Sequence, residues 1–141
     1  MARDSKLEHL AQVRLFSACT KKELALLGKA TDEVSVAAGK EVVTEGSVGH
    51  EFFLILDGTA NVIRNGRKIA TLGPGQYFGE MALLDKGVRT ATVKTETPTQ
   101  LLVLGQREFS GVLDEVPALA HKLLISMAAR LRESDERAYT H

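Results

Sequence analysis

Residues 78–93 read FGEMALLDKGVRTATV, an apolar and turn-rich stretch in which a glutamate and an arginine stand nine positions apart. The FGEMALL part predicts a short helix that begins just after Gly79. Gly87 marks a turn, and a strand is expected to begin at Arg89. Glu80 and Arg89 then have two possible roles. They form an ion pair that closes the loop, or they both face a ligand.

The chemistry of this stretch matches an anionic sugar phosphate. A helix that begins after Gly79 leaves backbone N–H groups without intrahelical partners, and these groups suit a phosphate. Gly79 has no Cβ, so a ligand can approach its backbone closely. Arg89 offers a permanently charged fork for two phosphate oxygens, and an ionised Glu80 accepts hydrogen bonds from hydroxyl groups such as those of a ribose. On the residues alone, the ligand site and the structural ion pair both stay open.

Short β-rich segments lie on both sides of the stretch and are separated by glycine-bearing turns. Many short strands with regular turn signals predict a sandwich or barrel rather than a parallel α/β sheet. Asn65-Gly66 is the strongest hairpin signal, because both central residues of that turn need a positive φ. The predicted strands are residues 33–37, 41–45, 52–56, 60–64, 68–72, 89–93 and 100–104.

The two ends of the sequence have helical patterns. Thr20 followed by Glu23 is a capping-box pattern and predicts a helix that ends at or before Ala30. Near the other end, Pro117 is suited to the first turn of a long helix. The apolar stripe of that helix, within residues 119–131, is wider than one domain face usually requires, which favours dimerisation through the helix. Packing of the helix against the β-rich middle of its own chain is the alternative.

The length and composition limit the possible classes of protein. At 141 residues the chain is expected to form one domain, with N-terminal helices in 1–30, a β-rich middle in 31–105 and C-terminal helices in 106–141. The 18 basic and 18 acidic side chains balance, so no basic excess points to nucleic acid. The single cysteine excludes an internal disulfide and favours a cytoplasmic setting, and no apolar run reaches the roughly 20 residues that span a bilayer.

The order of residues resembles the phosphate-binding cassette of cyclic-nucleotide-binding domains, both in residues 78–83 (FGEMAL) and in residues 89–93 (RTATV). Residues 54–58 (LILDG) and 73–77 (GPGQY) resemble the family's segments before the cassette. The resemblance covers nearly the whole chain. It implies a mainly β fold with flanking helices: an eight-stranded antiparallel β-roll of the jelly-roll type, N-terminal helices and a long C-terminal helix.

The resemblance also implies roles for individual residues. Glu80 would bind the ribose 2′-hydroxyl, Arg89 would bind the phosphate oxygens, and backbone amides near Ala82 would complete the phosphate site. The implied phosphate and ribose residues are Gly79, Glu80, Met81, Ala82, Arg89 and Thr90. The implied purine-lining residues are Val62, Ile69 and Leu72 in the strands, with Ser134 and Asp135 in the final helix. For Ile69 and Leu72, ordinary core packing is an alternative.

The identity of the base is a separate expectation. A threonine directly after the arginine, here Thr90, is associated in kinase relatives with cyclic GMP, whereas some channel relatives with the same threonine favour cyclic AMP. The resemblance to bacterial sensors favours cyclic AMP as the ligand, with cyclic GMP as the alternative.

Three other functions are alternatives to a cyclic-nucleotide sensor. An enzyme is disfavoured because the four histidines are scattered and no nucleophile has a nearby base signature, so we expect no catalytic residue, no metal and no cofactor. A DNA-reading regulator is disfavoured because no helix-turn-helix follows the long helix, unless the chain is a fragment of one. A ligand-free oligomerisation module is the third alternative. The sensor is expected to close its C-terminal helix over the nucleotide and to act through an unidentified effector protein.

Overall fold

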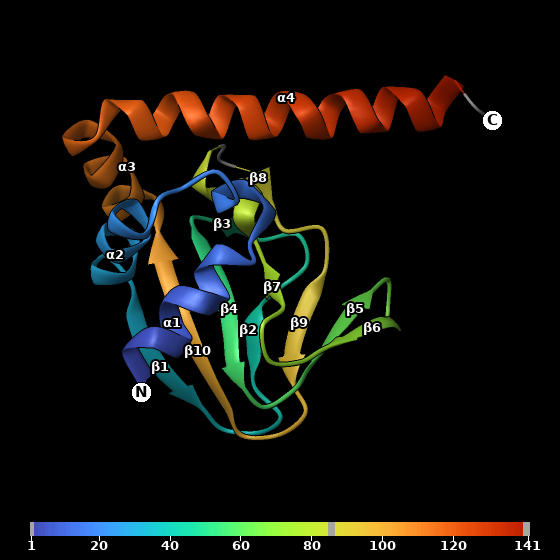
Figure 1. Cartoon of the computed structure of the whole chain (residues 1–141). Helices are drawn as coiled ribbons and strands as arrows, with labels where there is room; N and C mark the ends of the chain where they lie inside the picture. Colours follow the sequence, from blue (N-terminus) through green and yellow to red (C-terminus); the bar gives the residue numbers. More distant parts are fainter. Residues whose placement is uncertain (1, 85–86, 140–141) are drawn as a thin grey trace.

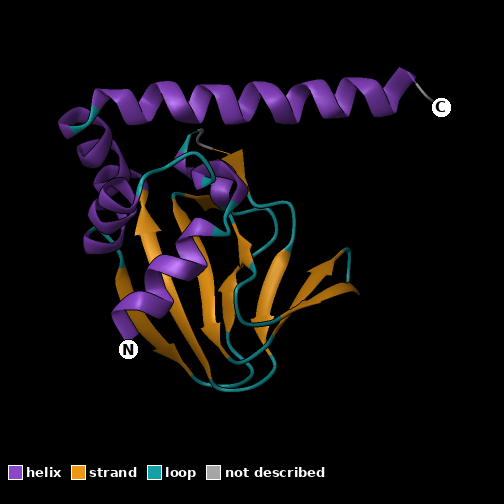
Figure 2. Cartoon of the chain, viewed as in Figure 1, coloured by secondary structure: helices purple, strands orange, loops and turns teal. Residues whose placement is uncertain are grey.

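Helices flank a core of antiparallel strands in the computed structural model of the chain (Figure 1). The structure describes the backbone of residues 2–84 and 87–139, and the side chains of these residues except those of 2–5, 81, 130 and 134–139. Figure 2 shows the strands gathered in the middle and the helices at the outside. The expected fold class is confirmed, although the described residues form ten strands where eight were expected.

The N-terminal part contains α1 (Ala2–Ala11), the 3₁₀ helix η1 (Arg14–Phe16) and α2 (Lys21–Lys29). The predicted capping box is present at the start of α2. The Glu23 N–H donates to Thr20 Oγ1 (3.2 Å), and the Thr20 N–H donates to Glu23 Oε1 (2.8 Å). These two bonds satisfy backbone donors that have no partner inside the helix. The helix ends at Lys29, within the predicted limit.

The strands pair in two sheets of four and one short pair. The first sheet has the order β1 (Asp32–Val36), β10 (Thr99–Gly105), β4 (Glu51–Asp57) and β7 (Tyr77–Phe78). The second has the order β2 (Glu41–Val43), β9 (Thr92–Thr95), β5 (Ala60–Arg64) and β6 (Arg67–Leu72). The short pair joins β3 (Val48–Gly49) to β8 (Gly87–Val88).

The segment after Gly87 differs from the sequence prediction. The strand expected at 89–93 begins at Thr92 instead of Arg89. The reason lies in the backbone hydrogen bonds of Arg89, whose N–H donates to the Ser47 carbonyl (2.7 Å) and whose carbonyl accepts from the Gly46 N–H (2.8 Å). Arg89 therefore pairs with the turn before β3, and the longer strand starts only at Thr92.

The hairpin between β5 and β6 has the predicted turn. Asn65 has φ 52° and Gly66 has φ 77°, the positive values that a two-residue turn of this type requires. Along the hairpin, Val62 pairs with Ala70 and Ile63 pairs with Lys68. Ile69 is therefore the extra residue of a β-bulge, which breaks the simple alternation of faces in β6.

The C-terminal part consists of α3 (Gln106–Glu115) and α4 (Pro117–Tyr139), and α4 begins at the predicted proline. Leu119 and Leu123 are buried at the start of α4. Further along, Arg14 Nη2 lies 2.8 Å from Glu133 Oε2, which ties α4 to η1. In Figure 1, α4 is the long helix that crosses one end of the strands.

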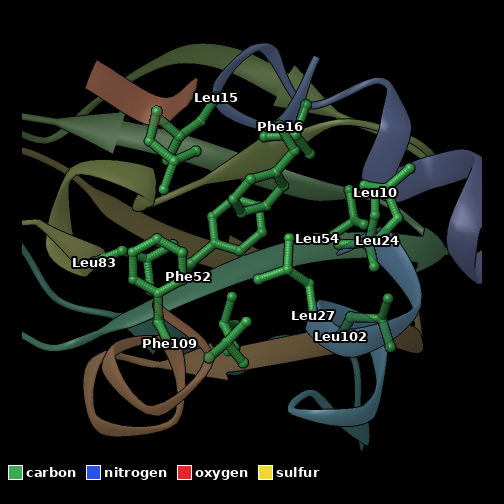
Figure 3. Packing of buried hydrophobic residues seen from close by; sticks show 14 of the residues in the cluster. Leu10, Leu15, Phe16, Leu24, Leu27, Phe52, Leu54, Leu83, Leu102 and Phe109 are labelled. Carbon is green, nitrogen blue, oxygen red and sulfur yellow. The ribbon is translucent and has the colours of Figure 1, made fainter. Parts of the chain in front are cut away.

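The main hydrophobic core joins the helices to the first sheet (Figure 3). The rings of Phe16 and Phe52 meet edge to face, with centroids 6.0 Å apart. Phe109 of α3 lies 6.3 Å from Phe16 by the same measure. A second cluster lies between the two sheets and includes Ile55 and Val93. Side chains of β4 belong to both clusters, and β4 is the strand that contacts the site described below.

Cys19 lies beside this core and is half-buried. Burial raises the pKa of its thiol to about 11, and the nearby negative charge of Glu23 acts in the same direction. The thiol is therefore protonated at neutral pH.

An ion pair between α2 and α4 predicts a pH-dependent contribution to stability. Lys122 Nζ lies 2.7 Å from Glu23 Oε1, and this hydrogen bond, together with the one from Thr20, lowers the pKa of Glu23. Because the pKa of Glu23 is lower in the folded than in the unfolded chain, its ionisation stabilises the fold. This contribution to stability is fully present above the pKa of glutamate in the unfolded chain, about 4.3, and is lost as the pH falls through the lower pKa of the folded state. Lys122→Met should lower the free energy of unfolding by about 1 kcal/mol at pH 7 and much less below pH 4.

Urea unfolding of both proteins between pH 3 and pH 7 measures this difference. Lys22→Met changes an exposed lysine of the same charge on α2 and should cost nothing at either pH. If Lys122→Met lowers the free energy of unfolding by the same amount at every pH from 3 to 7, the ion pair is not the cause of the loss.

Candidate functional site

A cavity of about 300 Å³ lies between the 78–93 stretch and the second sheet. The strands β2, β5 and β9 contribute Val43, Val62, Arg64 and Val93 to its wall. The rest of the wall comes from the stretch itself: Phe78, Gly79, Glu80, Ala82, Gly87, Val88, Arg89, Thr90 and Ala91. Val43, Val62 and Val93 form an apolar side on the strands, to which Arg64 adds a charge, and Glu80, Arg89 and Thr90 supply polar groups on the loop side.

Arg89 is held in a fixed position on the polar side. Its Nη2 donates to the Glu51 carbonyl at the start of β4 (2.7 Å). Its Cζ lies 5.8 Å from the centroid of the Phe53 ring, within cation–π distance. Phe53 is itself stacked on Phe78 with ring centroids 4.9 Å apart. The guanidinium is therefore supported from β4 and β7 and needs little ordering before it binds an anion.

Partial burial changes the electrostatics of this guanidinium. It lowers the pKa of Arg89, and the carboxylate of Glu51 opposes the shift. Arginine remains protonated throughout the range in which proteins are folded. A partly desolvated positive charge attracts an anion more strongly than one in water, because the effective dielectric constant is lower.

Two glycines leave the space that Arg89 occupies. A Cβ on Gly49 would lie 1.9 Å from Arg89 Nε and 2.2 Å from its Cζ. A Cβ on Gly79 would lie 2.5 Å from Arg89 Nη1 and 2.8 Å from the Glu51 carbonyl oxygen. Gly79 also has φ 82°, in the left-handed region that favours glycine. These two positions therefore admit only glycine while the arginine stays in place.

The helix expected after Gly79 is only the four-residue 3₁₀ helix η2 (Glu80–Leu83). The Ala82 N–H donates to the Gly79 carbonyl (3.0 Å), so this amide already has a partner inside the turn. The Ala82 carbonyl accepts a hydrogen bond from Gln106 Nε2 (3.2 Å) at the start of α3. The predicted phosphate loop is consequently connected to the C-terminal helices by a direct contact.

The structure brings most of the predicted phosphate and ribose residues together. Gly79, Glu80, Ala82, Arg89 and Thr90 all line the cavity. The side chain of Met81 lies outside the described residues. With Arg89 bonded to the backbone of β4, its place in the cavity is compatible with an anion site as well as with support of the loop.

The predicted purine-lining residues are placed differently from one another. Val62 lines the cavity. Ile69 is at the bulge of β6, is 52% exposed, and does not belong to the cavity wall. Leu72 packs against the hydrophobic cluster between the two sheets. For Leu72, the structure thus agrees with the alternative of ordinary core packing. The side chains of Ser134 and Asp135 lie outside the described residues.

Arg64 is a cavity residue that the sequence reasoning did not select. It is the last residue of β5, and its Nε donates to the Thr90 carbonyl (3.2 Å). A signal for it was present in the sequence. Residues i and i+2 of a strand share a face, so a cavity role for Val62 implies the same face for Arg64.

Among the described helices, none combines the length and the apolar character that a membrane-spanning segment needs. Within the residues that the structure describes, no group of three or more histidine, cysteine, aspartate or glutamate side chains is placed to hold a metal ion.

Residues 33–116 match the sequence profile of the family described as cyclic nucleotide-binding domain. The chain is 36% identical over 102 residues to the cyclic AMP receptor protein of Thermus thermophilus, a match that covers 69% of this chain and 47% of that protein. It is also 36% identical over 105 residues to the cAMP-dependent protein kinase regulatory subunit of Schizosaccharomyces pombe, with 74% of this chain and 26% of that protein covered. The matched region is thus less than half of each of these relatives.

Solved structures give the same result over more of the chain. The N-terminal domain of a transcriptional regulator from Streptomyces coelicolor A3(2) superposes with a TM-score of 0.86 at 32% identity, and the match covers 92% of this chain and 94% of that one. The regulatory domain of Toxoplasma gondii PKA, crystallised with cAMP, superposes with a TM-score of 0.72 at 29% identity, and the match covers 79% and 44% of the two chains.

Proposed function

Because the chain belongs to the cyclic nucleotide-binding domain family, we propose that it is a non-catalytic sensor of cyclic AMP or cyclic GMP. The observation that carries the proposal is the position of Arg89, whose guanidinium is fixed beside Gly79 in a cavity that Glu80 also lines. A cation, a close backbone and a hydroxyl acceptor are the groups that a ribose cyclic phosphate requires.

In this proposal the nucleotide lies along the cavity. The cyclic phosphate binds Arg89, and the glycine at position 79 lets the phosphate approach the backbone. The ribose 2′-hydroxyl donates to the carboxylate of Glu80. The purine covers the apolar side of the cavity, where Val62 and Val43 supply the contact.

Binding would be transmitted to the C-terminal helices through η2. The Gln106–Ala82 hydrogen bond couples the phosphate loop to α3, and α3 leads directly into α4. A ligand shifts such an equilibrium only by its difference in affinity between the two states. We expect α4 to close over the purine in the bound state. Hydrogen exchange in residues 106–133 that is unchanged by saturating nucleotide would contradict this mechanism.

Isothermal titration calorimetry with cyclic AMP and cyclic GMP tests the function itself. Heat of binding with one site per chain is expected from at least one of the two nucleotides. The matched control is 5′-AMP, which carries the same base and sugar but has an open phosphate with an extra charge. Absence of binding to both cyclic nucleotides would favour a ligand-free oligomerisation module of the same fold.

We also propose that two chains associate through α4. Leu124 and Leu131 are 64% and 65% exposed, and they are two helical turns apart on one face. Ile125, next to this stripe, is 56% exposed. Leu124→Glu should therefore convert a dimer to a monomer at micromolar concentration, as measured by light scattering after gel filtration.

The matched control for this variant is Glu115→Leu, which leaves the stripe intact, and it should remain dimeric. A monomeric wild type at high concentration, with and without nucleotide, would contradict the association.

We propose that the sensor acts through a partner protein. The superposition with an N-terminal domain of a transcriptional regulator favours a module that works within, or beside, a larger regulatory protein. The partner is proposed to be an effector protein whose contact with this chain changes when α4 moves. A pull-down with and without cyclic nucleotide tests it, and identical captured proteins in both conditions would contradict a ligand-dependent partner.

A further inference from the structure

Two guanidinium groups reach the cavity from different elements. That of Arg89 lies beside Gly49 and Gly79 and donates to β4. That of Arg64 comes from the end of β5 and is oriented by the bond from its Nε to the Thr90 carbonyl. Since the phosphate site is assigned to Arg89, the second guanidinium is not explained by the proposed function.

Arg64 lies near the part of the cavity that is assigned to the purine rather than to the sugar. Arg64 follows Val62 by two residues on the same strand face, a separation of about 6.7 Å between the Cα atoms. Both side chains line the cavity, and Val62 lies on its apolar side. A purine laid on Val62 therefore presents one of its edges to the arginine.

We propose that Arg64 reads this edge and gives the site a preference for cyclic GMP over cyclic AMP, an inference that rests on the proposed function. With Nε bonded to Thr90, the two terminal nitrogens of Arg64 remain to face the ligand. They can only donate hydrogen bonds. Guanine offers two neighbouring acceptors, O6 and N7, whereas adenine pairs its N7 acceptor with the N6 amino donor. An arginine here matches guanine and meets a like donor in adenine.

Titration of both nucleotides into the wild type and into Arg64→Gln tests the inference. The wild type should bind cyclic GMP about 5- to 150-fold more tightly than cyclic AMP, the range over which a bidentate arginine–guanine pair discriminates against the wrong base. Glutamine both donates and accepts, and it pairs with adenine N6 and N7. The ratio of the two affinities should therefore move toward cyclic AMP by about tenfold or more in Arg64→Gln.

Arg67→Gln is the matched control. Arg67 pairs with Arg64 across the hairpin and carries the same charge, but it does not belong to the cavity wall among the described residues. This variant should leave the affinity ratio unchanged. A wild type that prefers cyclic AMP, or an Arg64→Gln protein that loses affinity for both nucleotides equally, would overturn the assignment. Absence of binding by the wild type would instead remove the proposed function, and the assignment with it.

Discussion

Arg89→Ala is expected to weaken cyclic nucleotide binding by about 10- to 150-fold, the factor that corresponds to roughly 1.5–3 kcal/mol for a hydrogen bond to a charged group. The phosphate would lose both its counter-charge and a donor already fixed by Glu51 and Phe53. Arg89→Lys keeps the charge but not the forked guanidinium, so its affinity should lie between that of the wild type and that of Arg89→Ala. Calorimetric titration of the three proteins measures the series.

Two controls separate a binding effect from a folding effect. Arg67→Ala removes an exposed arginine outside the cavity wall and should bind as the wild type does. Arg89→Ala also leaves the Glu51 carbonyl without its side-chain donor, so thermal unfolding of each variant should be followed in parallel. A folded Arg89→Ala protein that binds within tenfold of the wild type would remove Arg89 from the phosphate site.

Gly49→Ala is expected to reduce affinity nearly as much, although the glycine itself makes no contact with ligand. An alanine Cβ would lie 1.9 Å from Arg89 Nε, so the guanidinium would have to leave its position and its bond to Glu51. The backbone of Gly49 is outside the left-handed region, and alanine fits it without strain. The loss of affinity should therefore come from the displaced arginine, on the order of tenfold or more.

A double-mutant cycle checks this reasoning. If Gly49→Ala acts through Arg89, it should have no further effect on affinity in an Arg89→Ala background. Gly111→Ala is the matched control, because a Cβ there meets no atom within 4 Å. Independent, additive effects of Gly49→Ala and Arg89→Ala would show that the glycine acts on the ligand by another route.

The features that the sequence predicted well depend on local chemistry. The capping box of Thr20 and Glu23, the Asn65-Gly66 turn and the helix start at Pro117 each depend on a few neighbouring residues. The resemblance of residues 78–93 to a phosphate-binding cassette added the fold class. The family is confirmed by the match over residues 33–116.

The features that the sequence did not predict depend on distant contacts. Arg89 is drawn out of the expected strand by hydrogen bonds to residues 46 and 47, more than forty positions away. The bulge at Ile69 depends on how β5 and β6 pair, and hydrophobicity gave no sign of it. The sequence alone does not distinguish Arg64, because an arginine next to a hairpin turn is usually solvated. A cavity role for Arg64 can be inferred only once the side of β5 on which Val62 lies is known to face the cavity.

The protonated thiol of Cys19 has a practical consequence for measuring the motion of α4. With a pKa of about 11, only about one thiol in ten thousand is a thiolate at pH 7, and the thiolate is the form that reacts with maleimides. The sequence contains no other cysteine. A cysteine introduced on the outer surface of α4 would thus take up a fluorophore selectively in the otherwise native chain. Its emission would report each nucleotide-dependent displacement of the helix in real time.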